Sequence, residues 1–472
     1  MPLILPGNVA TATASTGYDV ANSCRFNDGD SAYMRLTPGS AATSSRKMTA
    51  SFWCKRGSLG ITGRIFSADT SGSNNNRDSL FFNSDDELWL YIDNGQASNL
   101  KTIRVFRDPS AWYHIVLAID TTQSTNTDRV KIYINGVQET SFSSSGDGIV
   151  YPDQNYDVLG YGQNGREATI GADTDNGNSD NEWDGYLAEF VFIDGLQLAP
   201  TSFGEFDEDS PRIWKPKDVS GLTFGTNGFY LDFEDSSNLG NDANGGTDWT
   251  ETNLAATDQT TDTCTNNFAT MNSLVKGNTA STFSEGNLKV AAGGGWGHAV
   301  GNIGVAHGKW YWEVDEINAN NNAFFGICNE LNLGHLDGDS TPYSEAGLML
   351  YFYDGRRTID GTDSEGEYNA WGTTHGFALD LDSDPRTIKF YKDGSLEATE
   401  NLTANFPAGE FVFPIFMGSA SSNTASVEFN FGNPVTALAS GNADANGYGS
   451  FEFSPPSGYI AICTKNLGSD GG

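Results

Sequence analysis

The feature that most limits what this chain can fold into is a strand, turn and strand pattern that occurs twice. In the first copy, Val130, Ile132 and Ile134 alternate with more polar residues and are followed by Asn135 and Gly136. Successive side chains of a strand point to opposite faces, so the alternation predicts a strand with one buried face. An Asn-Gly pair adopts the positive φ angles of a two-residue turn, and these residues therefore predict a β-hairpin.

The second copy lies near the other end of the chain. Ile388 and Phe390 alternate with Lys389 and Tyr391, and an Asp-Gly pair at positions 393 and 394 supplies the turn. The residues around the two hairpins do not match, so the repetition does not indicate a duplication. We expect each hairpin to supply a central antiparallel pair in a sandwich of its own.

Composition supports an all-β fold with more than one domain. A chain of 472 residues is long enough for roughly two to four domains. The content of 38% hydrophobic and 12% aromatic residues can fill their cores, and 55 glycines suit many turns. Helix signals are sparse; the longest is a short stretch at residues 198–206, where Pro200 suits a first turn.

The strand candidates form two blocks, and we predict two antiparallel β-sandwich, jelly-roll-like domains joined by a structured connector. The expected parts are an N-terminal arm at residues 1–17, a sandwich at 18–206, the connector at 207–267 and a second sandwich at 268–472. Within the connector, residues 228–235 could form one strand that packs on either neighbour. The candidate strands are residues 48–56, 64–68, 79–83, 87–93, 111–120, 129–134, 186–194, 309–317, 323–329, 346–354, 376–382, 387–394, 411–418 and 426–432.

The charge balance excludes one class of partner. The chain has 26 Lys plus Arg against 61 Asp plus Glu, a net charge of −35. Such a surface repels phosphate backbones, so we expect no nucleic-acid partner. The acidic surface is either plainly solvated or adapted to calcium or salt. The first residues have neither a basic segment nor a long apolar run, so we expect no signal peptide and no membrane insertion.

The five cysteines have no metal-ligand spacing and are an odd number. We expect most of them to be buried thiols, which suits assembly in a reducing cytoplasm. They are Cys24, Cys54, Cys264, Cys328 and Cys463.

Both blocks resemble known families. The first resembles the laminin-G and concanavalin-A-like lectin family through CRFNDG at residues 24–29, SFWCKRG at 51–57, AWYHIVLAID at 111–120, VKIYINGV at 130–137 and GYLAEFVFIDGLQL at 185–198. The second resembles SPRY domains through GKWYWEVDEI at 308–317, FFGIC at 324–328, GFALDLDSDPRTIKFYKDG at 376–394 and the stretch at 411–432. These resemblances imply sandwich folds that bind ligands or partners through loops.

A third resemblance bears on biological role. The connector, with PRIWKPKDVSG at residues 211–221 and long polar stretches at 225–242 and 247–272, is similar to virion proteins of tailed phages from marine bacteria. It implies a non-enzymatic, tail-fibre-like adhesin that binds a host surface glycan or protein. The expected location is the virion, assembled in the host cytoplasm, with other virion proteins as partners and a homotrimer by analogy. The alternative is an architectural capsid- or tail-decorating subunit without a receptor site.

The residues offer little support for catalysis. β-Glucanases of the concanavalin-A-like fold need three acids at alternate positions of one strand. Here Glu313 and Asp315 share a face, but Ile317 stands at the third position, so we interpret them as ordinary edge-of-strand residues. His114 alternates with apolar residues, which indicates a structural histidine. We therefore predict that the protein is not an enzyme.

Two sets of residues could bind a ligand. No cofactor is required, but a loop with several oxygen ligands could hold Ca²⁺, or could be a plain solvated turn; its candidates are Asp173, Asp175, Asn178, Asp180 and Glu182. Aromatic and arginine residues in polar loops of the second block could stack on and read a saccharide, or could be core residues. These candidates are Trp296, Tyr343, Arg356, Arg357, Tyr368 and Trp371.

Overall fold

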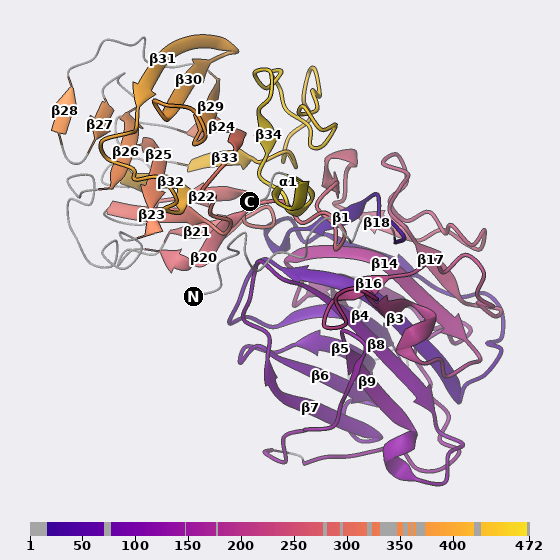
Figure 1. Ribbon diagram of the computed structural model, residues 1–472. Helices are drawn as coiled ribbons and strands as arrows, with labels where there is room; N and C mark the ends of the chain where they lie inside the picture. Colours follow the sequence, from indigo (N-terminus) through magenta and orange to yellow (C-terminus); the bar gives the residue numbers. More distant parts are fainter. Residues whose placement is uncertain are drawn as a thin grey trace. The chain divides into compact units, whose positions relative to one another are not determined.

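The protein is an all-β molecule with two compact units, as the sequence predicts. The computed structural model describes residues 17–69, 77–146, 148–175, 178–276, 281–292, 296–318, 323–330, 347–352, 357–359, 362–364, 373–419 and 426–469 (Figure 1). The first unit is Ala14–Thr265, and the second unit includes Asn266–Gly472.

The first unit is a sandwich of two antiparallel sheets. One sheet has the order β10 (Val137–Glu139), β9 (Val130–Ile134), β8 (Trp112–Asp120), β3 (Lys47–Arg56), β14 (Gly185–Asp194), β1 (Ser23–Phe26) and β19 (Gln259–Thr260), with β17 (Phe229–Leu231) also paired to β14. The other has the order β18 (Thr250–Thr252), β2 (Tyr33–Leu36), β11 (Ala168–Ile170), β4 (Gly63–Asp69), β5 (Arg77–Phe82), β6 (Glu87–Ile92) and β7 (Ser98–Val105). Two small hairpins, β12 (Asp173–Asp175) with β13 (Asn178–Asp180) and β15 (Gly204–Phe206) with β16 (Trp214–Pro216), complete the described strands of this unit.

Alternate residues of the strands fill the core between these sheets. Phe52 of β3 stacks on Phe190 of β14 with ring centroids 4.9 Å apart, and Phe66 of β4 meets Phe190 edge to face at 5.4 Å. All three rings are at most 1% exposed. Full burial of a side chain of this size contributes about 2–3 kcal/mol of transfer free energy. These three aromatic side chains therefore help to hold the two sheets together.

The segment that follows residue 206 belongs to the first unit. Its strands β17, β18 and β19 pair with β14, β2 and β1 of the sandwich. The end of this segment is joined to the sandwich by a buried ion pair, in which Lys55 Nζ of β3 lies 2.8 Å from Asp262 Oδ2. The sequence left open which neighbour the segment packs on, and the structure places its described strands on both sheets of the first unit.

The second unit is also a two-sheet sandwich. One sheet has the order β20 (Met271–Lys276), β23 (Trp296–Gly301), β32 (Val412–Ser419), β25 (Ala323–Asn329), β26 (Leu348–Phe352), β27 (Arg357–Ile359) and β28 (Thr362–Ser364). The other has the order β21 (Thr282–Ser284), β22 (Lys289–Ala291), β33 (Ser426–Asn430), β24 (Lys309–Asn318), β29 (Thr374–Asp380), β30 (Thr387–Lys392) and β31 (Ser395–Asn401), and the short strand β34 (Ile460–Ala461) runs parallel to β24.

The two predicted hairpins form, but not at the predicted place in their sheets. The turn residues have positive φ, 48° and 78° at Asn135 and Gly136 and 47° and 76° at Asp393 and Gly394. However, β10 and β31 are edge strands, so the prediction of central pairs is wrong. The physical reason is that the second arm of each hairpin is largely exposed, since Val137 and Gln138 of β10 are exposed and Ala398 is the buried apolar residue of β31.

Helical structure is minor in the described part of the chain. The stretch expected to be a short helix contains a single 3₁₀ turn, Pro200–Ser202, and then continues as strand β15. The six-residue helix α1 (Thr464–Ser469) lies near the end of the second unit. Among the described residues, no helix has the length and apolar character needed to cross a membrane. All five cysteines are free thiols, four of them buried.

Candidate functional site

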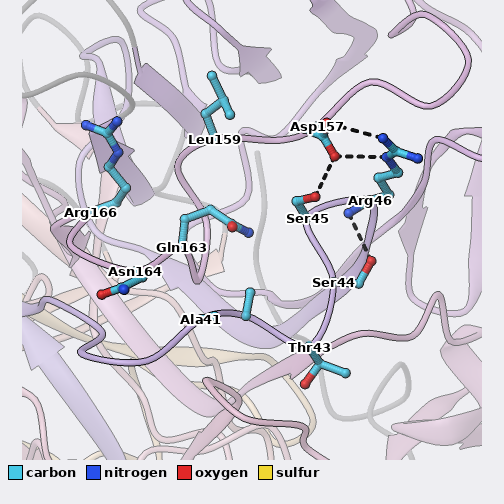
Figure 2. Close-up of a pocket in the computed structure, with 11 residues that line it drawn as sticks. Ala41, Thr43, Ser44, Ser45, Arg46, Asp157, Leu159, Gln163, Asn164 and Arg166 are labelled. Atoms are coloured by element: carbon cyan, nitrogen blue, oxygen red, sulfur yellow. Dashed lines mark hydrogen bonds and ion pairs between the residues drawn. The ribbon is translucent and has the colours of Figure 1, made fainter.

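A hollow of about 540 Å³ lies between two loops of the first unit. One loop leads into β3 and the other into β11. The loops are joined by backbone hydrogen bonds, since Val158 N–H donates to the Ser45 carbonyl and Gly165 N–H to the Pro38 carbonyl, both at 2.8 Å. The lining residues are Ala41, Ala42, Thr43, Ser44, Ser45, Arg46, Asp157, Leu159, Gln163, Asn164 and Arg166 (Figure 2).

A buried carboxylate holds the first loop in place. Asp194, the last residue of β14, is 3% exposed. Its Oδ2 accepts a hydrogen bond from Thr43 N–H at 2.7 Å, and its Oδ1 accepts one from Ser44 N–H at 3.2 Å. Hydrogen bonds from backbone N–H groups to an ionised acceptor are stronger than neutral ones. The backbone of this loop is therefore fixed before any ligand arrives.

A second buried carboxylate holds the other loop. Asp78 of β5 accepts from Gly160 N–H at 2.9 Å, and burial raises the pKa of Asp78 to about 6. Gly160 suits this close approach, because a Cβ there would lie 2.7 Å from the Asp78 carboxylate. Asn227 links both loops, since its side-chain amide donates to the carbonyls of Ser40 at 2.9 Å and Gly162 at 2.8 Å.

An ion pair forms one side of the hollow. Arg46 Nε donates to Asp157 Oδ1 at 2.8 Å, and Arg46 Nη2 donates to Asp157 Oδ2 at 3.3 Å. Ser45 Oγ donates to the same carboxylate at 2.5 Å. Hydrogen bonds from Arg46, followed by that from Ser45, lower the pKa of Asp157. The pair presents donors and acceptors side by side at the edge of the hollow.

The remaining lining residues supply further polar groups and one apolar contact. Figure 2 shows Gln163 between the Arg46–Asp157 pair and Arg166, which stands on the opposite side of the hollow. The Gln163 amide donates to the Tyr161 carbonyl at 3.3 Å, and no described residue donates to its oxygen. Leu159 is 46% exposed and offers an apolar surface beside these groups.

This set of residues is suited to binding. Asp157 is the single carboxylate among the residues that line the hollow, and it is held in an ion pair. Hydrolysis of a glycosidic bond ordinarily needs two carboxyl groups that flank the bond. The hollow combines hydrogen-bonding groups on two anchored loops with few apolar side chains, so it suits a polar ligand better than an apolar one.

Most of the predicted ligand-binding residues of the second unit lie outside the described residues. These are Tyr343, Arg356, Tyr368 and Trp371. Trp296 begins strand β23, but its side chain is also outside the described part. Arg357 lies in β27 and forms an ion pair with Glu400 of β31. A saccharide site in these loops therefore stays a prediction.

The predicted calcium residues lie on and beside a small hairpin. Asp173 of β12 is opposite Asp180 of β13, and the Asp173 carboxylate forms ion pairs with Arg77 and with Arg64, the latter at 3.7 Å. Glu182 follows β13 and is half-buried, and the side chain of Asp175 lies outside the described residues, as does that of Asn178. Within the described ranges, no three His, Cys, Asp or Glu side chains are grouped closely enough to hold a metal. Calcium binding stays a prediction, and the two arginines already neutralise Asp173.

His114 is structural, as the sequence indicates. Its Nε2 lies 2.9 Å from Ser51 Oγ, and Trp214 Nε1 donates to His114 Nδ1 at 2.9 Å. Because Nδ1 accepts from the indole, we assign the proton of the neutral ring to Nε2, which then donates to Ser51. Burial lowers the pKa of His114 to about 3. The ring cannot act as the base that would activate Ser51 as a nucleophile.

Glu313 of strand β24 is also structural. Glu313 is 1% exposed and accepts from the backbone N–H groups of Glu452 at 2.8 Å and Phe453 at 2.9 Å, and from the Tyr311 hydroxyl at 3.0 Å. Burial raises the pKa of Glu313 to about 7. The carboxylate anchors the segment after β33 onto the sheet, so its role is structural, but Glu313 is buried in a strand between β33 and β29 and is not an edge residue.

Comparisons with known proteins locate a family within the first unit. Residues 28–196 match the family model of the concanavalin A-like lectin/glucanases superfamily. A native heptameric SAP-like pentraxin from Limulus polyphemus is 18% identical over 39% of this chain and 80% of the pentraxin chain, with a TM-score of 0.29. The SPRY domain of human HERC1 is 19% identical over 34% of this chain and 96% of that chain, with a TM-score of 0.28. No curated protein matches the chain.

The family match includes the hollow. All of the residues that line it, from Ala41 to Arg166, fall within the matched residues 28–196. The prediction of a laminin-G or concanavalin-A-like domain in the first block is thus confirmed over this range, and a solved SPRY domain is among the structural neighbours.

Proposed function

We propose that the protein is a saccharide-binding protein whose ligand occupies the hollow between the loops before β3 and β11. The observation that carries the proposal is the preorganisation of the polar lining. Asp194 and Asp78 each accept a hydrogen bond from the backbone of one loop. The two loops are also hydrogen-bonded to each other. A site that is ordered beforehand does not lose loop entropy when a ligand binds.

The chemistry of the lining suits a sugar. Adjacent hydroxyl groups can donate to the Asp157 carboxylate and accept from the Arg46 guanidinium, which are joined by two hydrogen bonds. The Gln163 amide oxygen, to which none of the described residues donates, adds an acceptor. Leu159 supplies a surface for the apolar face of the ring. This mixture favours a polyhydroxylated ligand over a purely apolar one.

We further propose that this binding serves attachment to a host surface, with the protein acting as a tail-fibre-like adhesin of a phage virion. The support for this role is the similarity of the connector motif, at residues 211–221, 225–242 and 247–272, to virion proteins of tailed phages. The matched family contains lectins as well as glucanases. The lone, ion-paired carboxylate of the hollow supports the lectin role.

The experiment is a glycan array and titration calorimetry with the full chain and a Gln163→Ala/Asn164→Ala variant. Loss of two hydrogen-bonding side chains should weaken saccharide binding by about 10-fold or more. The matched control is Gln138→Ala, because Gln138 is an exposed glutamine on β10 of the same unit. Undiminished binding by the double variant would place the ligand elsewhere. A folded protein that binds no saccharide and no host cell would favour the architectural subunit.

A further inference from the structure

Arg166 differs from the other basic residues of the first unit. In a chain with 61 acidic and 26 basic residues, a partly buried cation normally finds a carboxylate. Arg56 pairs with Asp86 at 3.0 Å, and Lys55 pairs with Asp262 at 2.8 Å. The Arg166 guanidinium, although half-buried, has no hydrogen-bond or ion-pair partner among the described residues.

Other arginines without an ion pair have a different explanation. Arg129 donates to three backbone carbonyls, those of Gln123, Ser124 and Pro152. Arg35 and Arg212 are exposed, so water satisfies them. Arg166 is the half-buried arginine of the described first unit that lines a hollow without a partner of its own.

The position of Arg166 defines what it can contact. Figure 2 shows it across the hollow from the Arg46–Asp157 pair, with Gln163 between them. A ligand that fills the hollow therefore touches a neutralised ion pair at one end and an unpaired cation at the other. The Arg46 contact cancels the charge of Asp157, so the lining residues carry a net positive charge.

We propose that the ligand is an acidic saccharide whose carboxylate or sulfate group binds the Arg166 guanidinium, an inference that rests on the proposed saccharide site. A planar guanidinium donates two parallel hydrogen bonds to a carboxylate or a sulfate, and such pairs are stronger than neutral ones. The overall charge of −35 does not prevent this contact, because charges beyond about 8 Å are screened at physiological ionic strength.

The test uses the full chain on an array that pairs each acidic saccharide with a neutral counterpart. Carboxylates are compared with their carboxyl-reduced forms, and sulfated sugars with their desulfated forms, and affinities are then measured by calorimetry. We expect the acidic member to bind about 10-fold or more tightly than its neutral partner. Arg166→Gln should remove this preference, so that the acidic member binds with about the affinity of its neutral partner. The control Arg212→Gln removes the same charge from an exposed position of the same unit and should keep the preference.

The outcomes separate this inference from the proposed function. Equal affinity for acidic and neutral partners, with no effect of Arg166→Gln, overturns the inference and leaves the saccharide site intact. An acidic preference that Arg166→Gln does not change also overturns it. No binding of any saccharide by folded protein overturns both the inference and the proposed function.

Discussion

Glu189 occupies an unusual place in strand β14. Its φ is 50°, in the left-handed region that non-glycine residues rarely adopt, and the register of β14 with β3 shifts between Ala188 and Val191. Its carboxyl is 6% exposed and accepts from the Tyr230 hydroxyl at 2.8 Å. Burial raises the pKa of Glu189 to about 8, although the Tyr230 hydrogen bond opposes the rise.

This raised pKa predicts that stability falls as the pH rises from about 4.5 to about 8. The folded chain holds the Glu189 proton more tightly than the unfolded chain, so the stabilisation is present below the ordinary glutamate pKa and is lost as the pH rises to about 8. Glu189→Gln keeps a neutral side chain at every pH. At pH 8 its free energy of unfolding should exceed that of wild type by about 2–5 kcal/mol, and the difference should shrink toward pH 5.

Urea unfolding at pH 5 and pH 8 measures this difference. Glu208→Gln is the matched control, because Glu208 is exposed in the same unit and its substitution removes the same charge. A Glu189→Gln variant that is equally destabilised at both pH values would show that the carboxyl is not the titrating group.

The role of a single residue could be predicted from the sequence where the adjacent residues determine its environment. The role of His114 followed from its apolar flanks in one strand, and Glu313 and Asp315 were assigned to the strand in the same way. Arg46 and Arg166 gave no such signal, because they lie in irregular loops more than a hundred residues apart in sequence. Only the packing of the two loops brings them to one hollow.

At the scale of strands, one buried ion pair fastens the last segment of the first unit. Lys55 and Asp262 are at most 1% exposed, and Asp262 also accepts from Trp112 Nε1 at 3.2 Å. Removing one partner leaves a buried charge uncompensated, which costs about 3–5 kcal/mol. Lys55→Met should therefore destabilise the first unit by about this amount.

A double variant shows whether the ion pair stabilises the unit through its charges or through its packing. In Lys55→Met/Asp262→Asn no buried charge remains, and the asparagine still accepts from Trp112. We expect the double variant to recover most of the stability, as measured by hydrogen exchange of β1 and β3 amides. Additive losses from the two substitutions would mean that the contribution of the pair is packing rather than charge.

The hairpins show what strand patterns can and cannot predict. Alternation of Val130, Ile132 and Ile134 predicted a strand, and the positive φ of Asn135 and Gly136 confirms the turn. Local periodicity reports one buried face, but it carries no information on how many neighbours a strand has. The edge positions of β10 and β31 therefore became visible only in the sheet order.

At the scale of the whole molecule, the segment after residue 206 decides where the first unit ends. Strands β17, β18 and β19 complete its two sheets. We predict that a chain ending at residue 265 folds with a cooperative thermal transition, whereas one ending at residue 206 aggregates. Without the segment, the outer edges of β1 and β2 lose their partners, and exposed edges promote aggregation.

Circular dichroism melting and size-exclusion chromatography of the two truncated chains check this prediction. If the chain ending at residue 206 remains monomeric and melts at the same temperature as the longer one, the three strands are dispensable.

The sequence by itself determined the fold class, the positions of the main strands and turns and the resemblance of residues in the first block to concanavalin-A-like lectins, which the family match over residues 28–196 confirms. These properties depend on residues close together in the chain, through alternation, turn chemistry and local motifs. Only the tertiary structure decided the strand order, the packing of the segment after residue 206 and the hollow between two distant loops. Those features depend on contacts such as Asp194 with Thr43, where residues far apart in sequence meet because burial of a shared core brings them together.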